Sequence, residues 1–340
     1  MPKILVTGGA GFIGSHTVVS LVNAGFKPVI MDNLSNSKIE VLGALEEICQ
    51  QKIPFYQLDC TQLADYQNLF SKEKNIQAVI HFAAFKAVGE SVEKPLTYYH
   101  NNVQGLIALL QAMEKERISQ LVFSSSCTVY GQPKNLPVKE DTPRQQAESP
   151  YGNTKIICEN IITDYQSANK KFKSVLLRYF NPIGAHPSAK IGELPLGVPN
   201  NLVPFITQTA AGIRKELTVF GDDYNTRDGS AIRDYIHVMD LADAHVRALD
   251  YLKHSQEKPE VFNVGTGQGN TVLEVVDCFL KSCSKDLAYK IGPRRPGDVE
   301  SVYANTDKIE QKLNWKAQYS LEEALHHAWK WQQKLKELEY

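Results

Sequence analysis

The stretch KILVTGGAGFIG, residues 3–14, decides the fold of this chain. Its first five residues are a short apolar run without alternation, which is typical of a strand buried on both faces of a parallel sheet. Glycines follow at positions 8, 11 and 14, and the next residues, SHTVVSLVNAG, have helical spacing up to Gly25. A second apolar run, Pro28–Met31, ends in Asp32. This order of strand, glycine turn, helix, strand and acid predicts a βαβ unit.

The glycine turn has the spacing of a dinucleotide-binding motif. Gly8, Gly11 and Gly14 allow a tight turn, close approach of the backbone to a pyrophosphate, and tight packing of helix on strand. The free N–H groups that begin the helix would face the phosphates. Asp32 could accept hydrogen bonds from the adenosine ribose and would repel a 2′-phosphate, so the sequence predicts NAD rather than NADP. The alternative, a structural glycine turn with an incidental acid, is disfavoured by the complete order of elements.

Four further apolar runs indicate more strands with helices between them: Phe55–Leu58, Ala78–Phe82, Gln120–Ser124 and Ser174–Arg178. Strands that alternate with helices predict an α/β fold with a Rossmann-type, doubly wound parallel sheet. Ligands of such sheets bind beyond the carboxyl ends of the strands. We therefore expect the serines at 124–126 to lie near the nicotinamide end of a bound dinucleotide.

The composition changes after residue 180, where the segment 181–204 is rich in Pro, Gly and Asn. We expect an NAD-binding domain over residues 1–180 and a smaller, loop-rich domain over residues 181–340. Tyr235–Val238 and Val261–Val264 are strand-like, and the segment near 235–245 is expected to return to the main sheet.

The bulk properties exclude several classes of protein. The 340 residues carry a net charge of −1, with no basic stripe for nucleic acid and no polybasic run for a membrane surface. The sequence shows no signal-peptide pattern and no apolar run of membrane-spanning length. Six scattered cysteines without a CxxC pair indicate free thiols in the cytoplasm, and the nine histidines form no metal-ligand pattern.

A second glycine-rich segment, VGTGQGN at residues 264–270, also lies between a predicted strand and a predicted helix. A second dinucleotide site there is disfavoured, because the glycine spacing differs and the next strand-like run, Leu287–Ile291, does not end in an acid. Thr271 and Glu274 instead have the spacing of a capping box. We interpret this segment as structural.

The stretch SPYGNTK, residues 149–155, carries the candidate chemistry. Pro150 favours the start of a helix, and Tyr151 and Lys155 would then lie about one turn apart on one face. An ammonium beside a phenol lowers the pKa of the phenol, so Tyr151 is a candidate acid and base. Taken alone, such a pair on an exposed helix is more often without function; its setting after a dinucleotide motif is what favours the chemistry.

Ser126, Tyr151 and Lys155, together with the glycine motif, resemble the extended short-chain dehydrogenase/reductase superfamily. A longer series of motifs resembles one family within it, the UDP-glucose 4-epimerases. In order along nearly the whole chain, these motifs are GGAGFIGSH, DNLSNS, HFAAFKAVGESV, YYHNNV, SSSCTVYG, SPYGNTK, LRYFNPIGAHPS, VPNNL, IRDYIHVMDLADAH and RRPGD.

The resemblance implies two sets of binding residues. The set for NAD comprises Gly8, Gly11, Phe12, Ile13, Gly14, Asp32, Asn33, Leu34, Ser35, Asn36, Ser37, Asp59, Cys60, Phe82, Ala83, Ala84, Phe85, Lys86, Asn101, Ser126, Tyr151, Lys155 and Phe180. The set for the nucleotide sugar comprises Lys86, Ser126, Tyr151, Asn181, Asn200, Asn201, Leu202, Thr218, Val219, Phe220, Arg233, Arg295, Asp298 and Val302. The two arginines suit diphosphate oxygens, although each could also be a surface ion-pair partner.

The resemblance also implies the reaction, a reversible interconversion of UDP-glucose and UDP-galactose through a 4-keto sugar, with transient reduction of tightly bound NAD. Tyr151 would be the acid and base, Lys155 would hold the nicotinamide ribose, and Ser126 would hydrogen-bond the C4 oxygen. A valine at position 302 would leave room for the acetamido group of UDP-GlcNAc or UDP-GalNAc. The family implies a homodimer joined by helices near 95–115 and 151–168.

Three alternatives stay open at this point. A nucleotide-sugar 4,6-dehydratase would need an acidic pair beside the catalytic Ser or Thr, but Cys127 and Thr128 follow Ser126. An ordinary dehydrogenase would release its cofactor, so that added NAD would yield stoichiometric NADH. A non-catalytic NAD-binding sensor would not need Ser126, Tyr151 and Lys155, yet all three residue types are present.

Overall fold

The computed structural model describes residues 1–254, 257–295 and 298–337, and the chain divides into two compact units. Unit 1 comprises Met1–Gly131, Pro143–Tyr179 and Ala242–Phe262, and unit 2 comprises Gln132–Thr142, Phe180–Leu241 and Asn263–Tyr340. The division therefore differs from a single boundary at residue 180, because one segment from each half of the chain belongs to the opposite unit.

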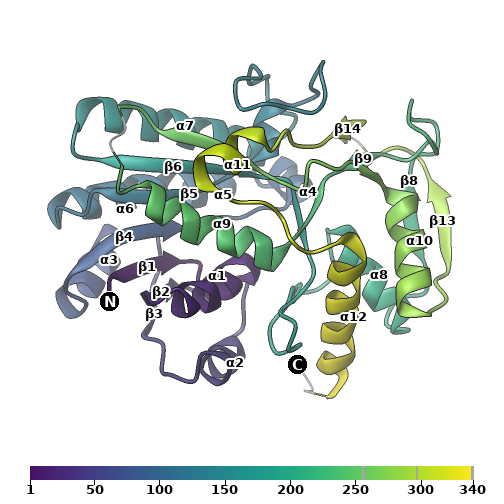
Figure 1. Cartoon of the computed structure of the whole chain (residues 1–340), viewed down its shortest axis with the longest axis horizontal. Helices are drawn as coiled ribbons and strands as arrows, with labels where there is room; N and C mark the ends of the chain where they lie inside the picture. Colours follow the sequence, from purple (N-terminus) through teal and green to yellow (C-terminus); the bar gives the residue numbers. More distant parts are fainter. Residues whose placement is uncertain (255–256, 296–297, 338–340) are drawn as a thin grey trace. The chain divides into compact units, whose positions relative to one another are not determined.

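Unit 1 is built on a seven-stranded sheet in the order β11-β6-β5-β4-β1-β2-β3, of which Figure 1 labels the strands from β6 to β3. The strands are β1 (Lys3–Thr7), β2 (Lys27–Asp32), β3 (Phe55–Gln57), β4 (Ile76–His81), β5 (Gln120–Ser126), β6 (Lys173–Tyr179) and β11 (Glu260–Val264). The pairs from β3 through β6 are all parallel. The prediction of a doubly wound parallel sheet is confirmed, and its strand order reverses between β1 and β4, where such folds bind their ligands.

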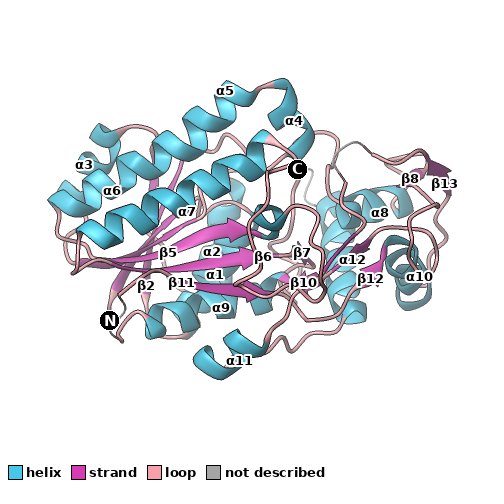
Figure 2. Cartoon of the chain, turned by 90° about the horizontal axis from the view of Figure 1, so that it is seen from above, coloured by secondary structure: helices cyan, strands magenta, loops and turns pink. Residues whose placement is uncertain are grey.

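The helices of unit 1 bury both faces of this sheet (Figure 2). They are α1 (Phe12–Asn23), α2 (Glu40–Cys49), α3 (Leu63–Lys72), α4 (Val88–Glu93), α5 (Pro95–Tyr98), the π-helix η1 (Tyr99–Gln104), α6 (Gly105–Lys115), the 3₁₀ helix η2 (Cys127–Tyr130), α7 (Pro150–Ala168) and the larger part of α9 (Val238–Tyr251). Side chains of α3, α6 and α7 share one apolar core with Leu5, Val79 and Leu121 of the strands. The alternate strand residues, such as Ile4 and Val6, are equally buried on the other face, where α1 lies.

The described residues of unit 2 form short strands and helices. Its elements are β7 (Asn181–Ile183), α8 (Leu202–Ala210), β8 (Leu217–Phe220), β9 (Ile232–Arg233), β10 (Tyr235–His237), β12 (Asn270–Thr271), α10 (Val272–Cys283), β13 (Tyr289–Gly292), β14 (Ser301–Val302), α11 (Asp307–Leu313) and α12 (Leu321–Glu337). The strands pair as β10-β7, β12-β9-β14 and β13-β8. Val276, Phe279, Leu325 and Trp329 belong to one core that α8, α10 and α12 enclose.

The strand predicted near 235–238 does not return to the main sheet. β10 pairs with β7, with Tyr235 opposite Asn181, whereas the later strand β11 joins the main sheet beside β6. This part of the prediction was wrong because an apolar run indicates a strand but does not specify its partner. No helix within the described residues is long and apolar enough to cross a bilayer.

Candidate active site

The turn after β1 has the shape of a phosphate-binding cradle. Gly8 has a φ of +71°, and a Cβ there would lie 2.8 Å from the backbone nitrogen of Ala83. A Cβ on Gly14 would overlap the carbonyl oxygen of Gly8. Gly11 is the N-cap residue of α1 and has no side chain, so no side-chain cap occupies the first N–H groups of the helix. These features fit a pyrophosphate at the helix N-terminus.

Asp32 lies at the end of β2, directly beside this turn. One carboxylate oxygen accepts from the backbone nitrogen of Ala10 at 3.1 Å, and the other accepts from the nitrogen of Leu34 at 2.8 Å and the hydroxyl of Ser37 at 3.1 Å. Leu34 has a φ of 59°, which turns the loop of residues 33–37 tightly around the acid. The carboxylate is thereby fixed in position, as an acceptor for a ribose hydroxyl must be.

The loop after β4 is held by an amide that the sequence reasoning missed. Asn102, which is buried in η1, accepts from the nitrogen of Phe85 at 2.8 Å and donates to its carbonyl oxygen at 3.0 Å. It also donates to Thr154 of α7 at 3.0 Å, while the neighbouring Asn101 donates to Asn102. In the same loop the Lys86 ammonium lies 6.0 Å from the ring centre of Phe12. The signal in the sequence was the motif YYHNNV, residues 98–103, which contains Asn102.

The remaining members of the predicted cofactor set lie at the ends of strands. Asp59 and Cys60 follow β3, where Asp59 accepts from the nitrogen and hydroxyl of Thr61 at 2.8 and 2.9 Å. Burial raises the pKa of the Cys60 thiol to about 12, so it stays protonated. Phe180 belongs to unit 2, where it is buried and its nitrogen donates to Val264 at 3.3 Å.

Ser126, Tyr151 and Lys155 come together where β5 and α7 meet. Ser149 caps α7 by accepting from the nitrogen of Gly152 at 3.2 Å, and Pro150 occupies the first turn, as predicted. The Lys155 ammonium lies 6.0 Å from the Tyr151 ring centre. The hydroxyl of Ser126 is hydrogen-bonded to Tyr151 and accepts from the hydroxyl of Thr128 at 3.0 Å.

The electrostatics of this trio differ from the prediction in one respect. Desolvation raises the pKa of Tyr151 to about 12, and the hydrogen bond with Ser126 lowers it only in part. The expectation that Lys155 depresses this pKa was wrong for the chain by itself, since the ammonium faces the carbonyl oxygen of Ser124 at 2.6 Å. Desolvation also lowers the pKa of Lys155 to about 8. On β4, burial and the nearby Lys155 lower the pKa of His81 to about 3, so His81 is neutral.

In unit 2, five of the predicted substrate residues form one group. Asp298 accepts from Arg295 at 3.1 Å and from Arg233 at 3.5 Å, so two guanidinium groups flank one carboxylate. The Arg295 guanidinium lies 5.5 Å from the ring centre of Phe220. Val302 of β14 pairs with Arg233 of β9 and is 4% exposed. Arg233 is largely buried, which disfavours its alternative interpretation as a surface ion-pair partner.

The other predicted substrate residues of unit 2 lie on three elements. Asn181 begins β7, and its nitrogen donates to Asp234 at 2.9 Å. Asn200 and Asn201 precede α8, which begins at Leu202, and Asn201 donates to Glu193 at 2.6 Å. Thr218 and Val219 lie in β8 with Phe220.

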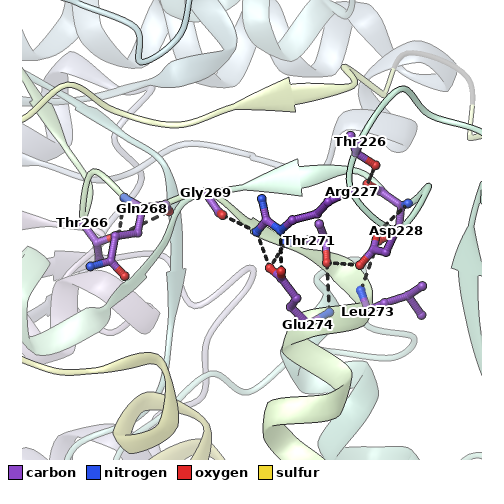
Figure 3. Close-up of polar contacts among 10 residues, drawn as sticks. Thr226, Arg227, Asp228, Thr266, Gln268, Gly269, Thr271, Leu273 and Glu274 are labelled. Atoms are coloured by element: carbon purple, nitrogen blue, oxygen red, sulfur yellow. Dashed lines mark hydrogen bonds and ion pairs between the residues drawn. The ribbon is translucent and has the colours of Figure 1, made fainter.

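The glycine-rich segment at 264–270 has a structural role, as interpreted from the sequence. The buried Asp234 accepts from the nitrogen and hydroxyl of Thr266 at 2.8 and 2.7 Å and from the nitrogen of Gly267 at 3.0 Å. Thr271 and Glu274 form the predicted capping box at the start of α10, and Glu274 also pairs with Arg227 (Figure 3). Three donors of this turn are thus already bonded to one carboxylate. Within the described part of the chain, no group of three or more His, Cys, Asp or Glu side chains could hold a metal ion.

These features define a class: a Rossmann-type α/β protein with a glycine turn, a β2 acid and a Ser-Tyr-Lys site, which is the extended short-chain dehydrogenase/reductase superfamily. Residues 5–328 match the family model described as GDP-mannose 4,6 dehydratase. The chain is 49% identical to the UDP-glucose 4-epimerase of Bacillus subtilis (strain 168), over 97% of this chain and 96% of that protein. It is 52% identical to the bifunctional UDP-glucose 4-epimerase and UDP-xylose 4-epimerase 1 of Pisum sativum, over 97% and 95%.

A solved structure supports the same family assignment. The UDP-glucose 4-epimerase from Bifidobacterium longum, in complex with NAD⁺ and UDP, superposes with a TM-score of 0.94 at 44% identity, over 98% of both chains. The chain therefore belongs to the UDP-glucose 4-epimerase family. The family model bears the name of a dehydratase, but relatives near half identity over nearly the full length are epimerases.

Proposed function

We propose that this protein interconverts UDP-glucose and UDP-galactose by inverting C4 of the hexose. The observation that carries the proposal is the meeting of Ser126, Tyr151 and Lys155 at the end of β5, on the same unit as the glycine cradle and Asp32. The cofactor is NAD, which when bound accepts the hydride from C4 and returns it to the opposite face of the 4-keto sugar.

The chain supplies proton transfer and orientation. Tyr151 removes the proton of the C4 hydroxyl and later returns one, while Ser126 holds the C4 oxygen by a hydrogen bond. Because desolvation raises the pKa of Tyr151, the phenol favours its protonated form, and a positive charge beside it favours the phenolate. Lys155 carries that charge and binds the nicotinamide ribose. The cradle and Asp32 hold the dinucleotide through the whole cycle.

The nucleotide end of the substrate is assigned to unit 2. Arg233 and Arg295 bind the diphosphate, because planar guanidinium groups match its oxygens in pairs. Asp298 keeps both arginines in place until the substrate arrives. A firmly bound UDP leaves the hexose free to turn over between the two hydride transfers.

The experiment that tests this function is incubation of the purified protein with UDP-galactose and no added NAD, followed by NMR of the anomeric protons. We expect UDP-glucose to appear until equilibrium is reached. No conversion, although denatured protein releases NAD, would refute the epimerase assignment.

The same sample separates the alternatives. A 4,6-dehydratase would give a 4-keto-6-deoxy sugar, with a new methyl signal; the 3₁₀ turn after Ser126 offers Cys127 and Thr128 rather than carboxylates. An ordinary dehydrogenase would produce NADH in proportion to added NAD. A sensor would bind NAD and leave the sugar unchanged.

Val302 is the residue that we propose to set the substrate range. Its small side chain, beside Arg233 in the β9–β14 pair, would leave space at C2 of the hexose, so that UDP-GlcNAc and UDP-GalNAc are also converted. Val302→Tyr should abolish conversion of the acetamido sugars while retaining that of UDP-galactose. Absence of any conversion of UDP-GlcNAc by the unaltered protein at high concentration would contradict this part.

We also propose a homodimer that works in the cytoplasm. The helices near 95–115 and 151–168 would form the interface, and Val92 and Leu96 beside them are 61% and 82% exposed in the single chain. The six cysteines are free thiols, which suits a reducing compartment. Light scattering of the purified protein should give twice the mass of one chain, and Leu96→Glu should shift it toward the monomer.

A further inference from the structure

Three consecutive serines at the end of β5 each contact a different residue on one face of α7. The carbonyl oxygen of Ser124 accepts from Lys155 at 2.6 Å, and the hydroxyl of Ser126 is hydrogen-bonded to Tyr151. The hydroxyl of Ser125, between them, donates to Glu159 at 2.5 Å. Residues 151, 155 and 159 are spaced by four and so form one stripe on the helix. The proposed catalytic side chains therefore share this stripe with a buried carboxylate that the proposed function does not use.

Glu159 is joined to the neighbouring strand by a bidentate ion pair. Arg178 of β6 donates through Nε to one carboxylate oxygen at 2.9 Å and through Nη2 to the other at 2.7 Å. Glu159 is 2% exposed and Arg178 is 4% exposed. Two parallel hydrogen bonds between planar groups fix their mutual orientation as well as their distance.

The pair is tied to two further segments. The third nitrogen of Arg178 donates to the hydroxyl of Tyr130 in η2 at 2.9 Å, and the guanidinium lies 4.9 Å from the centre of that ring. Arg144, in the loop that leads into α7, lies 3.4 Å from the second Glu159 oxygen. The carboxylate thus links α7 to β5, to β6 and to its own preceding loop. Figure 2 shows α7 beside β5 and β6.

We propose that Glu159, oriented by Arg178, is a positioning residue. It fixes the rotation of α7 about its axis and the position of α7 along that axis, so that Tyr151 and Lys155 lie at the end of β5. The inference rests on the proposed function, in which those two side chains act on sugar and cofactor. A buried ion pair adds little net stability compared with apolar side chains of similar volume, whereas it defines geometry well. The carboxylate also acts on Lys155: desolvation lowers the pKa of Lys155 to about 8, and the nearby Glu159 opposes that shift.

The test compares Glu159→Gln with a matched control, Glu73→Gln. Glu73 is also a carboxylate of unit 1 that accepts from a cation and a phenol, Lys3 at 2.7 Å and Tyr56 at 2.9 Å, but it follows α3 and its partners lie on β1 and β3. We expect E159Q to lower kcat for UDP-galactose by about 10- to 100-fold with KM within about threefold, because small misplacements of reacting groups have effects of this size. Hydrogen exchange of the α7 peptide at 150–158 should become about tenfold faster. E73Q should change neither.

E159Q leaves the buried Arg178 without its carboxylate partner and could fail to fold. A second variant therefore removes both charges. In Glu159→Met/Arg178→Met the pair is replaced by apolar side chains, a change that is often neutral or stabilising. We expect an unfolding temperature near that of the unaltered protein, together with the low kcat and the fast exchange of α7. Unaltered kcat and exchange in this double variant would overturn the positioning role. Loss of epimerisation in the unaltered protein would instead refute the proposed function, and the exchange measurement would still decide whether Glu159 positions α7.

Discussion

The ammonium of Lys155 donates to the backbone carbonyl oxygen of Ser124 across 2.6 Å. Both residues belong to unit 1, and Lys155 is buried there. Its desolvation lowers the pKa of the Lys155 ammonium to about 8. The first prediction follows from the protonation of this group.

We expect kcat to fall as pH rises through about 8, because Lys155 is charged below its pKa and neutral above it. In the proposed function Lys155 supplies the positive charge beside the phenolate of Tyr151, and a neutral lysine would no longer supply it, so the acid and base step weakens. The measurement is kcat for UDP-galactose from about pH 6 to about pH 10. In Lys155→Arg the charge persists throughout this range, so the alkaline limb should disappear whatever the absolute rate. A limb at the same pH in both proteins would assign it to another group.

Tyr151→Phe should lower kcat by about 10²- to 10⁴-fold, the loss expected when a general acid and base is removed. The bound NAD should remain, because the ring itself is retained. Tyr165→Phe is a control on the same helix, where Tyr165 packs against Phe172 at the far end. Near-full activity in Y151F would exclude the phenol as the proton carrier.

Sequence reasoning succeeded where the determining contacts are local. The β1 strand, the turn at 8–14 and α1 are adjacent in the chain, and Tyr151 and Lys155 are one helical turn apart, so composition and spacing were sufficient. The capping box of Thr271 and Glu274 was predictable for the same reason.

The failures concern contacts between distant segments. Nothing in the run Tyr235–His237 indicates that it pairs with β7, and the sign of the Tyr151 pKa shift depends on desolvation by the folded chain. Glu159 and Arg178 lie on different elements, and each alone has the pattern of an ordinary polar residue. Their partnership is visible only after α7 has packed on β5 and β6.

Asp32→Ala should reduce the NAD retained on purification. The carboxylate orders three donors, from Ala10, Leu34 and Ser37, and it is the proposed acceptor for the adenosine ribose. The measurement is the NAD released per chain after acid denaturation. Asp243→Asn, at an exposed pair with Arg247, is the control and should retain the full amount. Equal NAD in both variants would remove Asp32 from the cofactor site.

Glycine to alanine substitutions at two positions should have opposite effects. At Gly14 the new Cβ would overlap the Gly8 carbonyl oxygen and lie 2.8 Å from the Cα of Gly9, so the turn must open. We expect Gly14→Ala to lose NAD and to lower the unfolding temperature, since the overlap is with backbone that cannot move aside. At Gly43, in α2, the added Cβ has no heavy atom within 4 Å apart from its chain neighbours and the backbone of its own helix. Gly43→Ala should raise the free energy of unfolding by about 1 kcal/mol through helix propensity alone. Thermal unfolding and the NAD content of both variants test these two predictions. An undiminished NAD content in G14A would show that the turn does not hold the dinucleotide.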